Sequence, residues 1–219
     1  MQYTLLEFTE VRLEQRDGHK LRGYFAQLFG KESDLFHNHA SDGRSIYRYP
    51  LIQYKVVRGV PMVVGLGEGA SQIVERFWQI KEIDINGNRF ALHQKHLQTE
   101  ELDVGLGNDL QSYEFVSPWM PLNQENVRKY HSYGEKERVE QLKSILIRNI
   151  LNVFSAVGHR AEQQIMVHLD LGPAKVSKFK NQHMLNFQGS FVSNAILPSY
   201  IGLGKSVSRG FGSICKSNG

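Results

Sequence analysis

A tight turn in the first half of the chain limits the folds that this sequence can adopt. Residues 46–57 and 61–64 are rich in β-branched and aromatic side chains, and Arg58-Gly59 stands between them. Two such runs joined by a two-residue turn predict an antiparallel hairpin. Before them, residues 3–9 alternate as a strand does, and the apolar spacing from His19 to Gly30 is helical. The first part of the chain therefore predicts a strand, a helix and a hairpin.

A second helix and further strands are expected after this hairpin. Residues 70–79 have helical spacing with Ile73, Val74 and Phe77 inward, and β segments follow around residues 82–85 and 89–96. The complete order is that of a ferredoxin-like unit.

The second half of the chain repeats this order after the run Gly105-Leu106-Gly107-Asn108-Asp109. We expect a strand at 113–117, a long helical region over 123–158, strands at 165–171 and 184–192, a short helix or turn after Pro198, and a last strand at 211–215. The prediction is an α+β protein of two tandem ferredoxin-like domains, residues 1–109 and 110–219.

Charge is distributed unevenly along the 219 residues. The net charge is +4, yet no Asp or Glu follows Asp170, so residues 171–219 carry +6 and the first 170 residues carry −2. Aromatic residues are interleaved with these C-terminal cations. A one-sided cationic segment with rings available for stacking favours binding to a nucleic acid over a merely solvated face. The six cations are Lys175, Lys178, Lys180, Lys205, Arg209 and Lys216.

Several classes of protein are excluded by composition. Cys215 is the only cysteine, so no internal disulfide and no cysteine-based zinc site can form. No stretch approaches the roughly 20 apolar residues that span a bilayer, and the first 18 residues lack a cationic leader. We expect a cytoplasmic protein that does not contact membranes.

A glycine-rich stretch at residues 202–212 has the composition of a ligand-binding loop. Gly202-Leu203-Gly204 and Gly210-Phe211-Gly212 enclose five residues, among them Lys205, Ser206, Ser208 and Arg209. Glycine lets another backbone approach closely, and the cations favour an anion. A nucleotide-triphosphate loop is rejected, because Ser199 stands where that motif needs glycine and glycines follow where it needs a helix. A flexible connection before the last strand is the alternative.

A second glycine run, Gly65-Leu66-Gly67-Glu68-Gly69-Ala70, fits a dinucleotide-binding pattern, with Asp84 as a possible ribose ligand. The preceding strand belongs to the antiparallel hairpin, however, whereas a dinucleotide fold needs a parallel unit. Glu68 would also repel a pyrophosphate. We interpret these glycines as a strand-to-helix turn, and the dinucleotide enzyme is kept as a weak alternative.

Histidine and tyrosine residues gather before the hairpin. His37 and His39 lie in a polar connection, and Tyr47 and Tyr49 share one face of the expected strand. A histidine can take a proton near neutral pH, a tyrosine can donate to a developing oxyanion, and Arg44 could contact a phosphate; together they could cleave RNA. A metal site is the weaker interpretation, because His37 and His39 lack a third ligand with convincing spacing. That these are ordinary surface histidines is an interpretation as good as the catalytic one.

The two glycine brackets around five residues, before the last strand, resemble the signature loop of the CRISPR-associated endoribonucleases that process precursor crRNA. These enzymes are the sixth Cas family, within the RAMP superfamily of RRM-like tandem folds. The resemblance implies metal-independent cleavage of CRISPR repeat RNA by 2′-OH attack, giving a 2′,3′-cyclic phosphate and a 5′-hydroxyl. It implies no cofactor, and repeat RNA as the partner. Other Cas proteins of an interference complex are further candidate partners, and the assembly is a monomer or homodimer.

Site residues also follow from the resemblance. It implies His37 or His39 as general base, Tyr47 as orienting or protonating group, with Tyr49 a weaker substitute. Some relatives use a lysine near the histidine; none lies between Lys31 and Lys55 here, so Arg44 is our choice. A non-catalytic crRNA-binding subunit is the alternative function. The expected RNA-binding residues are Gly202, Gly204, Lys205, Ser206, Ser208, Arg209, Gly210, Lys175, Lys178 and Lys180.

Overall fold

The computed structural model describes residues 1–36, 48–179 and 182–217. The chain divides into two compact units. The first comprises Met1–Asp103 together with Ser208–Gly210, and the second comprises Val104–Val207 and Phe211–Gly219.

The first unit is built on a four-stranded antiparallel sheet in the order β2-β3-β1-β6. From the other edge this reads fourth, first, third, second strand, which is the ferredoxin-like order. Arg58 and Gly59 have φ values of 49° and 82°, as a two-residue hairpin turn between β2 and β3 requires. The strands are β1 (Gln2–Glu7), β2 (Ile52–Val57), β3 (Val60–Leu66) and β6 (His96–Glu101).

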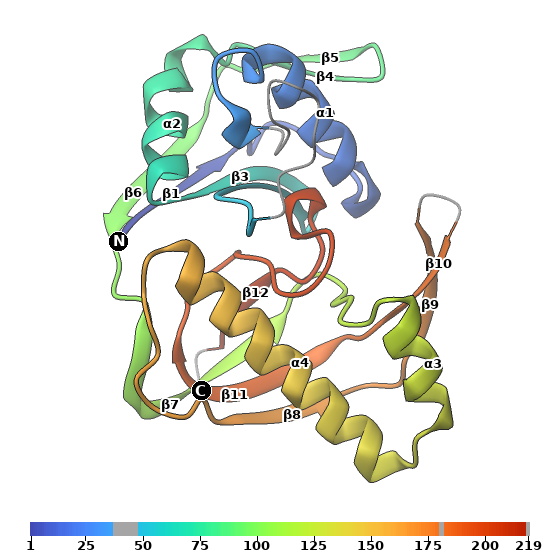
Figure 1. Cartoon of the computed structure of the whole chain (residues 1–219). Coiled ribbons are helices and arrows are strands. Elements are labelled where there is room, and N and C mark those ends of the chain that lie inside the picture. Colours follow the sequence, from blue (N-terminus) through green and yellow to red (C-terminus); the bar gives the residue numbers. More distant parts are fainter. Residues whose placement is uncertain (37–47, 180–181, 218–219) are drawn as a thin grey trace. The chain divides into compact units, whose positions relative to one another are not determined.

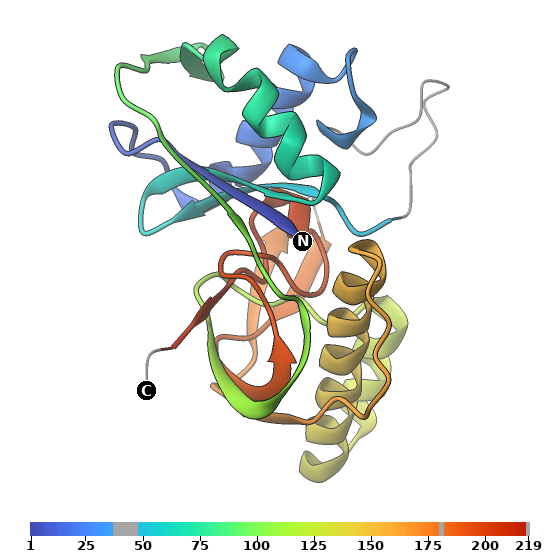
Figure 2. The same ribbon diagram turned by 90° about the vertical axis from the view of Figure 1, so that its left-hand side faces the viewer.

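Two helices, α1 (Gly18–Phe29) and α2 (Glu68–Arg76), lie on the same face of this sheet (Figures 1 and 2). Leu21, Phe25 and Phe29 of α1 are buried in the core with Ile73 of α2. Three short 3-10 turns lie in the same unit, at Gln15–Asp17, Asp34–Phe36 and Phe77–Gln79. The prediction that Val74 faces inward was wrong, because its side chain is 37% exposed.

The strand that completes the first sheet was not predicted. The expected segments around residues 82–96 instead give a separate two-stranded hairpin of β4 (Glu82–Ile85) and β5 (Asn88–Ala91). The sheet is completed by β6, whose residues are mostly exposed. An edge strand without alternating apolar residues gives no period-2 signal in the sequence.

The second unit has a four-stranded sheet in the order β12-β7-β11-β8, which is again the ferredoxin-like order. Residues 105–109, expected as the domain boundary, form the first part of β7. The expected strand at 184–192 is two strands, β10 and β11, and β10 pairs with the unpredicted β9 in a separate hairpin. The strands are β7 (Gly105–Phe115), β8 (Val167–Leu171), β9 (Lys175–Phe179), β10 (Gln182–Asn186), β11 (Gly189–Ile196) and β12 (Ile214–Lys216).

Helix α4 (Glu135–Ala156) covers one face of the second sheet, and α3 (Gln124–Ser132) precedes it (Figures 1 and 2). The predicted apolar stripe of α4 is buried: Leu142, Ile145, Leu146, Ile150 and Phe154. Residues 197–213, all of which the structure describes, join β11 to β12 without a second long helix. That connection contains the glycine-rich stretch and one 3-10 turn, Val207–Arg209.

Both units confirm the predicted ferredoxin-like architecture. Among the helices that the described residues form, none is long and apolar enough to cross a bilayer.

Candidate nucleic-acid interface

Four of the predicted catalytic residues, His37, His39, Arg44 and Tyr47, lie outside the described residues. The described residues on either side of them are close together in the first unit, because Arg48 Nη2 lies 3.2 Å from Asp34 Oδ2. Strand β2 begins at Ile52, so half-buried Tyr49 precedes the strand that was expected to carry it.

Tyr54 of β2 holds the chain at Phe36, the residue before His37. The Tyr54 hydroxyl donates a hydrogen bond of 3.1 Å to the Phe36 carbonyl oxygen. Its ring stacks on Phe25 of α1 with 5.4 Å between the centroids. Tyr54 is fully buried, and this burial raises the pKa of its hydroxyl, so the group stays protonated and remains a donor.

Two arginines lie near this point. Arg22 on α1 is half-buried, and burial lowers the pKa of its guanidinium, an effect that Tyr54 partly opposes. Arg209 is also half-buried, and its pKa is lowered first by burial and then by the charge of Arg22. Neither shift discharges an arginine near neutral pH.

Glycines allow Ser208–Gly210 to pack against α1 and β2 within the first unit. A Cβ added at Gly18, the first residue of α1, would lie 2.7 Å from the Arg209 carbonyl oxygen. Gly210 has a φ of 94°, and a Cβ there would lie 3.3 Å from the Tyr54 carbonyl oxygen. The cationic end of the glycine-rich stretch therefore lies against α1 and β2.

Lys55, next to Tyr54, is fully buried in β2. Burial lowers the pKa of its ammonium to about 7, since a charged amine loses its hydration in the interior.

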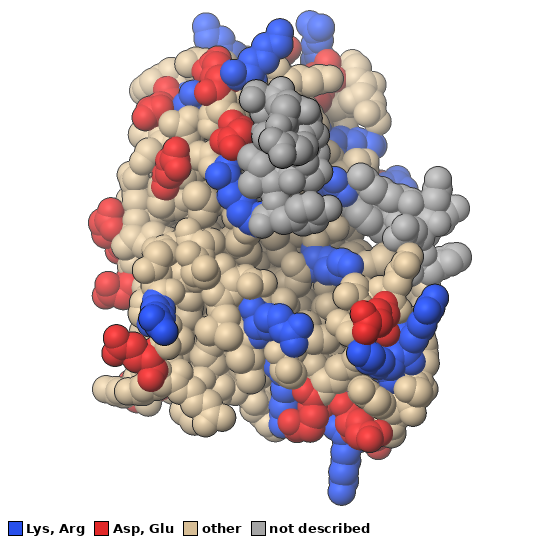
Figure 3. All heavy atoms as spheres, in the orientation of Figure 1, with Lys and Arg blue, Asp and Glu red and all other residues tan. Residues whose placement is uncertain are grey.

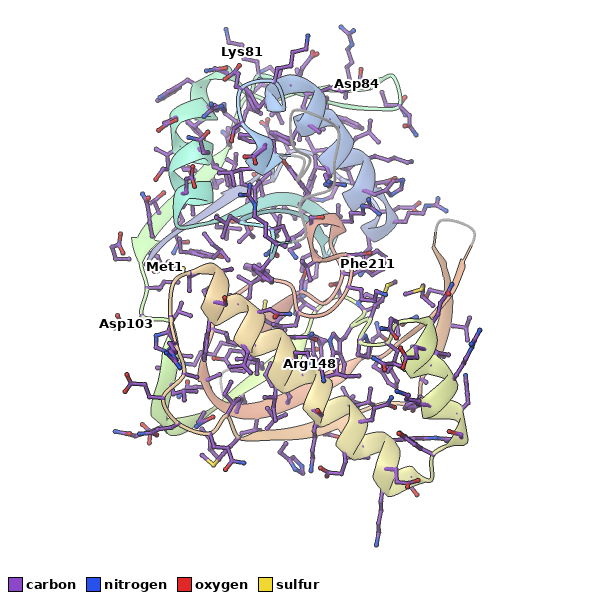
Figure 4. All side chains as sticks on the ribbon, viewed as in Figure 1. Met1, Lys81, Asp84, Asp103, Arg148 and Phe211 are labelled. Carbon is purple, nitrogen blue, oxygen red and sulfur yellow. The ribbon has the colours of Figure 1, made fainter. Side chains whose placement is uncertain are left out.

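The remainder of the glycine-rich stretch is fixed within the second unit. Gly202 forms an isolated bridge with Ser213, and the Leu203 amide donates to the Gly212 carbonyl over 2.9 Å. At Gly212, where φ is 63°, a Cβ would overlap the Leu203 carbonyl oxygen. The two glycine brackets thus face each other, and only glycine permits the close approach. Phe211 lies in this stretch (Figure 4).

Gly204 and Lys205 lie against the segment after β7. A Cβ at Gly204 would lie 2.9 Å from the indole nitrogen of Trp119, and the Lys205 amide donates to the Met120 carbonyl over 2.9 Å. Trp119 is fully buried and donates to Asn149 of α4 over 3.3 Å. These contacts leave the Lys205 side chain exposed.

A groove of about 480 Å³ opens beside Lys205 in the second unit. It lies at the N-terminal end of α3, where the helix dipole favours anions, and the Asn126 amide there donates to Asn123 Oδ1 over 2.7 Å. Arg128 adds a second cation, whereas Glu125 is engaged by Lys129 at 2.8 Å. Residues lining the groove are Asn123, Gln124, Glu125, Arg128, Met184 and Lys205.

Other cations of the second unit are spread over its surface. Lys175 is exposed and donates to the Gln188 side chain over 3.0 Å. Arg148 lies midway along α4 (Figure 4) and is exposed. On the face seen in Figure 3, Lys and Arg side chains of this unit lie in the middle as well as at the margin, and the acidic ones lie at the margin. The Lys178 side chain and Lys180 lie outside the described residues.

The second glycine run serves packing. Strand β3 is antiparallel to both β1 and β2, so a parallel dinucleotide-binding unit is absent from this described sheet. A Cβ at Gly65 would lie 2.6 Å from Ile73 Cδ1, and a Cβ at Gly69 would overlap the Leu51 carbonyl oxygen. The prediction of a strand-to-helix turn is confirmed. Within the described ranges, no three His, Cys, Asp or Glu side chains form a group that could hold a metal ion.

The sequence did not single out Arg22 and Arg128 at this candidate interface, nor the buried Tyr54 and Lys55 of β2. Arg22 looks like a solvent-facing residue of an amphipathic helix, and Tyr54 and Lys55 look like ordinary members of a β-rich run. Gly18 was the available signal, because a glycine at the start of a helix marks a place where another backbone can approach.

Comparison with known proteins matches both halves of the chain. A family model described as the Cas6b N-terminal domain matches residues 1–103, and one described as the Cas6b C-terminal domain matches residues 105–217. A crystal structure of Cas6b has a TM-score of 0.93 and 34% identity, covering 99% of each chain. That of a CRISPR RNA processing endoribonuclease Cas6b has a TM-score of 0.79 and 31% identity, covering 99% of this chain and 100% of the other.

An uncharacterized protein of Methanocaldococcus jannaschii, MJ0978, is 29% identical over 137 residues, which are 63% of this chain and 93% of that protein. Since the two Cas6b models together match almost every residue, this chain belongs to the Cas6b family.

Proposed function

We propose that this protein is an endoribonuclease that cuts CRISPR repeat RNA in precursor crRNA without a metal ion. The observation that carries the proposal is the match to both Cas6b domains, together with 31% identity to a CRISPR RNA processing endoribonuclease. The exposed Lys205 and the half-buried Arg209 support it, because affinity for RNA depends on cations that neutralise phosphates.

The proposed reaction is an internal transesterification. His37 or His39 takes the proton of the 2′-hydroxyl before the cut, and O2′ forms a bond to the adjacent phosphorus. The bond from this phosphorus to the 5′-oxygen of the next nucleotide breaks, and Tyr47 orients or protonates the departing oxygen. A 2′,3′-cyclic phosphate and a 5′-hydroxyl result. Arg44 offsets the charge that develops on the phosphate.

The described residues support a binding role for the glycine-rich stretch. Gly202 forms a bridge with Ser213, Gly204 packs closely against Trp119, and Gly210 packs against the Tyr54 carbonyl. We propose that the cations between the brackets contact the RNA backbone. We propose that the groove beside Lys205 and Arg128 receives a backbone phosphate in the second unit. Ser206, Ser208 and the lysines at 175, 178 and 180 add further contacts to the strand.

The test uses labelled repeat RNA from a CRISPR array beside the gene, incubated with excess EDTA. We expect a product with a cyclic phosphate end, and no product when the nucleotide before the cut carries 2′-deoxyribose. The double variant His37→Ala, His39→Ala is expected to lose cleavage while its RNA affinity stays within a few fold. Tight binding without any product would instead identify a non-catalytic crRNA-binding subunit. Cleavage that EDTA abolishes would contradict the metal-independent mechanism.

A further inference from the structure

Arg22 projects from the face of α1 that packs against Ser208–Gly210, within the first unit. Gly18 lies on this face, since a Cβ there would lie 2.7 Å from the Arg209 carbonyl oxygen. Arg22 follows Gly18 by four residues, and residues four apart in a helix lie on one face, one turn apart. The Arg22 side chain therefore leaves the helix beside the backbone of Arg209.

The Arg22 guanidinium lies close enough to that of Arg209 to affect it. Each is half-buried, and the charge of Arg22 contributes to the lowered pKa of Arg209. Two like charges near one another in a partly dehydrated place repel, and this repulsion is offset when an anion binds to both. Guanidinium groups suit a phosphate especially well, because their paired N–H donors match two of its oxygens.

The pair of Arg22 and Arg209 also lies near the chain that precedes the candidate histidines. Arg22 lies within electrostatic reach of Tyr54, whose hydroxyl donates to the carbonyl oxygen of Phe36. Phe25 keeps Tyr54 close to Arg22, because it lies three residues after Arg22 on α1 and its ring stacks on the Tyr54 ring. A ligand of Arg22 would thus lie near the chain that leads into His37.

We propose that Arg22 and Arg209 together bind one backbone phosphate of the RNA, which makes Arg22 a substrate-binding residue. The nature of the ligand rests on the proposed function. Arg22 supplies a cation from the helix and Arg209 one from the glycine-rich stretch, so the phosphate is held between two elements of the same unit.

The test measures binding of repeat RNA that carries 2′-deoxyribose at the mapped cut, at several salt concentrations. Arg22→Gln and Arg209→Gln are each expected to weaken binding about tenfold and to lower the slope of log affinity against log salt by about one contact. The double variant should lose little more than either single variant, because both arginines serve one phosphate. Arg89→Gln is the matched control: it removes an exposed arginine of β5 in the same unit and should bind within about twofold of the wild type.

A second measurement locates the phosphate. RNAs with a single uncharged methylphosphonate are compared position by position in the wild type and in Arg22→Gln. We expect one position that weakens wild-type binding and has no further effect in the variant. Equal losses at every position in the two proteins, or wild-type affinity of Arg22→Gln, would overturn the proposal.

These measurements are independent of cleavage. If the wild type binds repeat RNA and does not cut it, unmodified RNA serves for the same comparison, and the proposed function fails while the phosphate site is still judged. If circular dichroism shows that Arg22→Gln does not fold, Arg209→Gln and Arg22→Lys replace it. Arg22→Lys keeps the charge, so it should keep the salt slope. Its affinity for the methylphosphonate RNAs should differ from the wild-type pattern at the same single position. A pattern that differs at no position would overturn the proposal.

Discussion

The hydroxyl of Tyr54 donates a hydrogen bond to the carbonyl oxygen of Phe36, across a distance of 3.1 Å in the interior of the first unit. This contact joins the middle of β2 to the residue that precedes His37. The strand thereby determines where the chain of the candidate histidines begins, although no histidine belongs to the strand.

Replacing Tyr54 with Phe tests this contact. The ring and its stacking on Phe25 are retained, but the Phe36 carbonyl loses its donor, so unfolding should become easier by about 1–2 kcal/mol. We also expect a slower single-turnover cleavage rate. Tyr24→Phe is the matched control, because the Tyr24 hydroxyl donates to the carbonyl of Glu82 over 2.8 Å, away from Phe36. Equal rates for the two variants would contradict the expected role of Tyr54.

Lys205→Ala should weaken RNA binding and reduce its salt dependence by about one phosphate contact, since the side chain is exposed beside the groove at α3. Binding is measured with uncleavable repeat RNA at several salt concentrations. Lys143→Ala is the control in the same unit: this lysine of α4 pairs with Glu140 at 2.8 Å. A salt slope that changes equally in both variants would show that only net charge matters.

Gly212→Ala should damage the glycine-rich stretch. The new Cβ would overlap the Leu203 carbonyl oxygen at a residue with φ of 63°, so we expect a loss of roughly 3 kcal/mol or more of unfolding free energy, or failure to fold. RNA affinity should fall with it. Gly23→Ala provides the contrast, because a Cβ on this residue of α1 meets nothing within 4 Å and should stabilise the helix by about 0.5–1 kcal/mol. The free energy of unfolding of both variants is measured with urea.

Lys55 should make stability depend on pH. Its pKa is about 7 in the folded protein, below the value of about 10.4 for an exposed lysine, so between these values the unfolded chain binds more protons. The free energy of unfolding should therefore rise with pH in this range, by up to about 1.4 kcal/mol per unit. Lys55→Met should flatten that rise between pH 7 and 9 in urea unfolding. An identical pH dependence in the wild type and Lys55→Met would show that the amine is charged when folded.

Much of the architecture could be predicted because it depends on local patterns. The Arg58-Gly59 turn has a short-range signal, because a glycine between two β-rich runs permits the positive φ of a two-residue turn. The buried stripe of α4 has another, which is helical spacing of apolar residues. The strand β6 has no such signal, since it is an exposed edge. The split between β10 and β11 was also missed. Phe187 pairs there with Trp119, and Gly189 has a φ of 137°, and neither follows from the composition of the run.

The site was less predictable than the fold. Cations between glycines in residues 202–212 indicated an anion-binding loop. The proximity of Arg22 to Arg209 depends on packing between residues 187 positions apart, which one sequence does not reveal. Likewise, the contact between Tyr54 and Phe36 arises only in the folded protein, and the sequence indicates no more than a buried core tyrosine in a strand.

The connection between β11 and β12 has a wider consequence. Two copies of one topology are present, and the copy at the C-terminus has exchanged a helix for a glycine-rich passage. A helix there would have restricted change, because its apolar stripe must keep matching the sheet. A passage whose shape comes from a few glycines leaves the side chains between them free to vary. Those few side chains can therefore change while both sheets keep their cores.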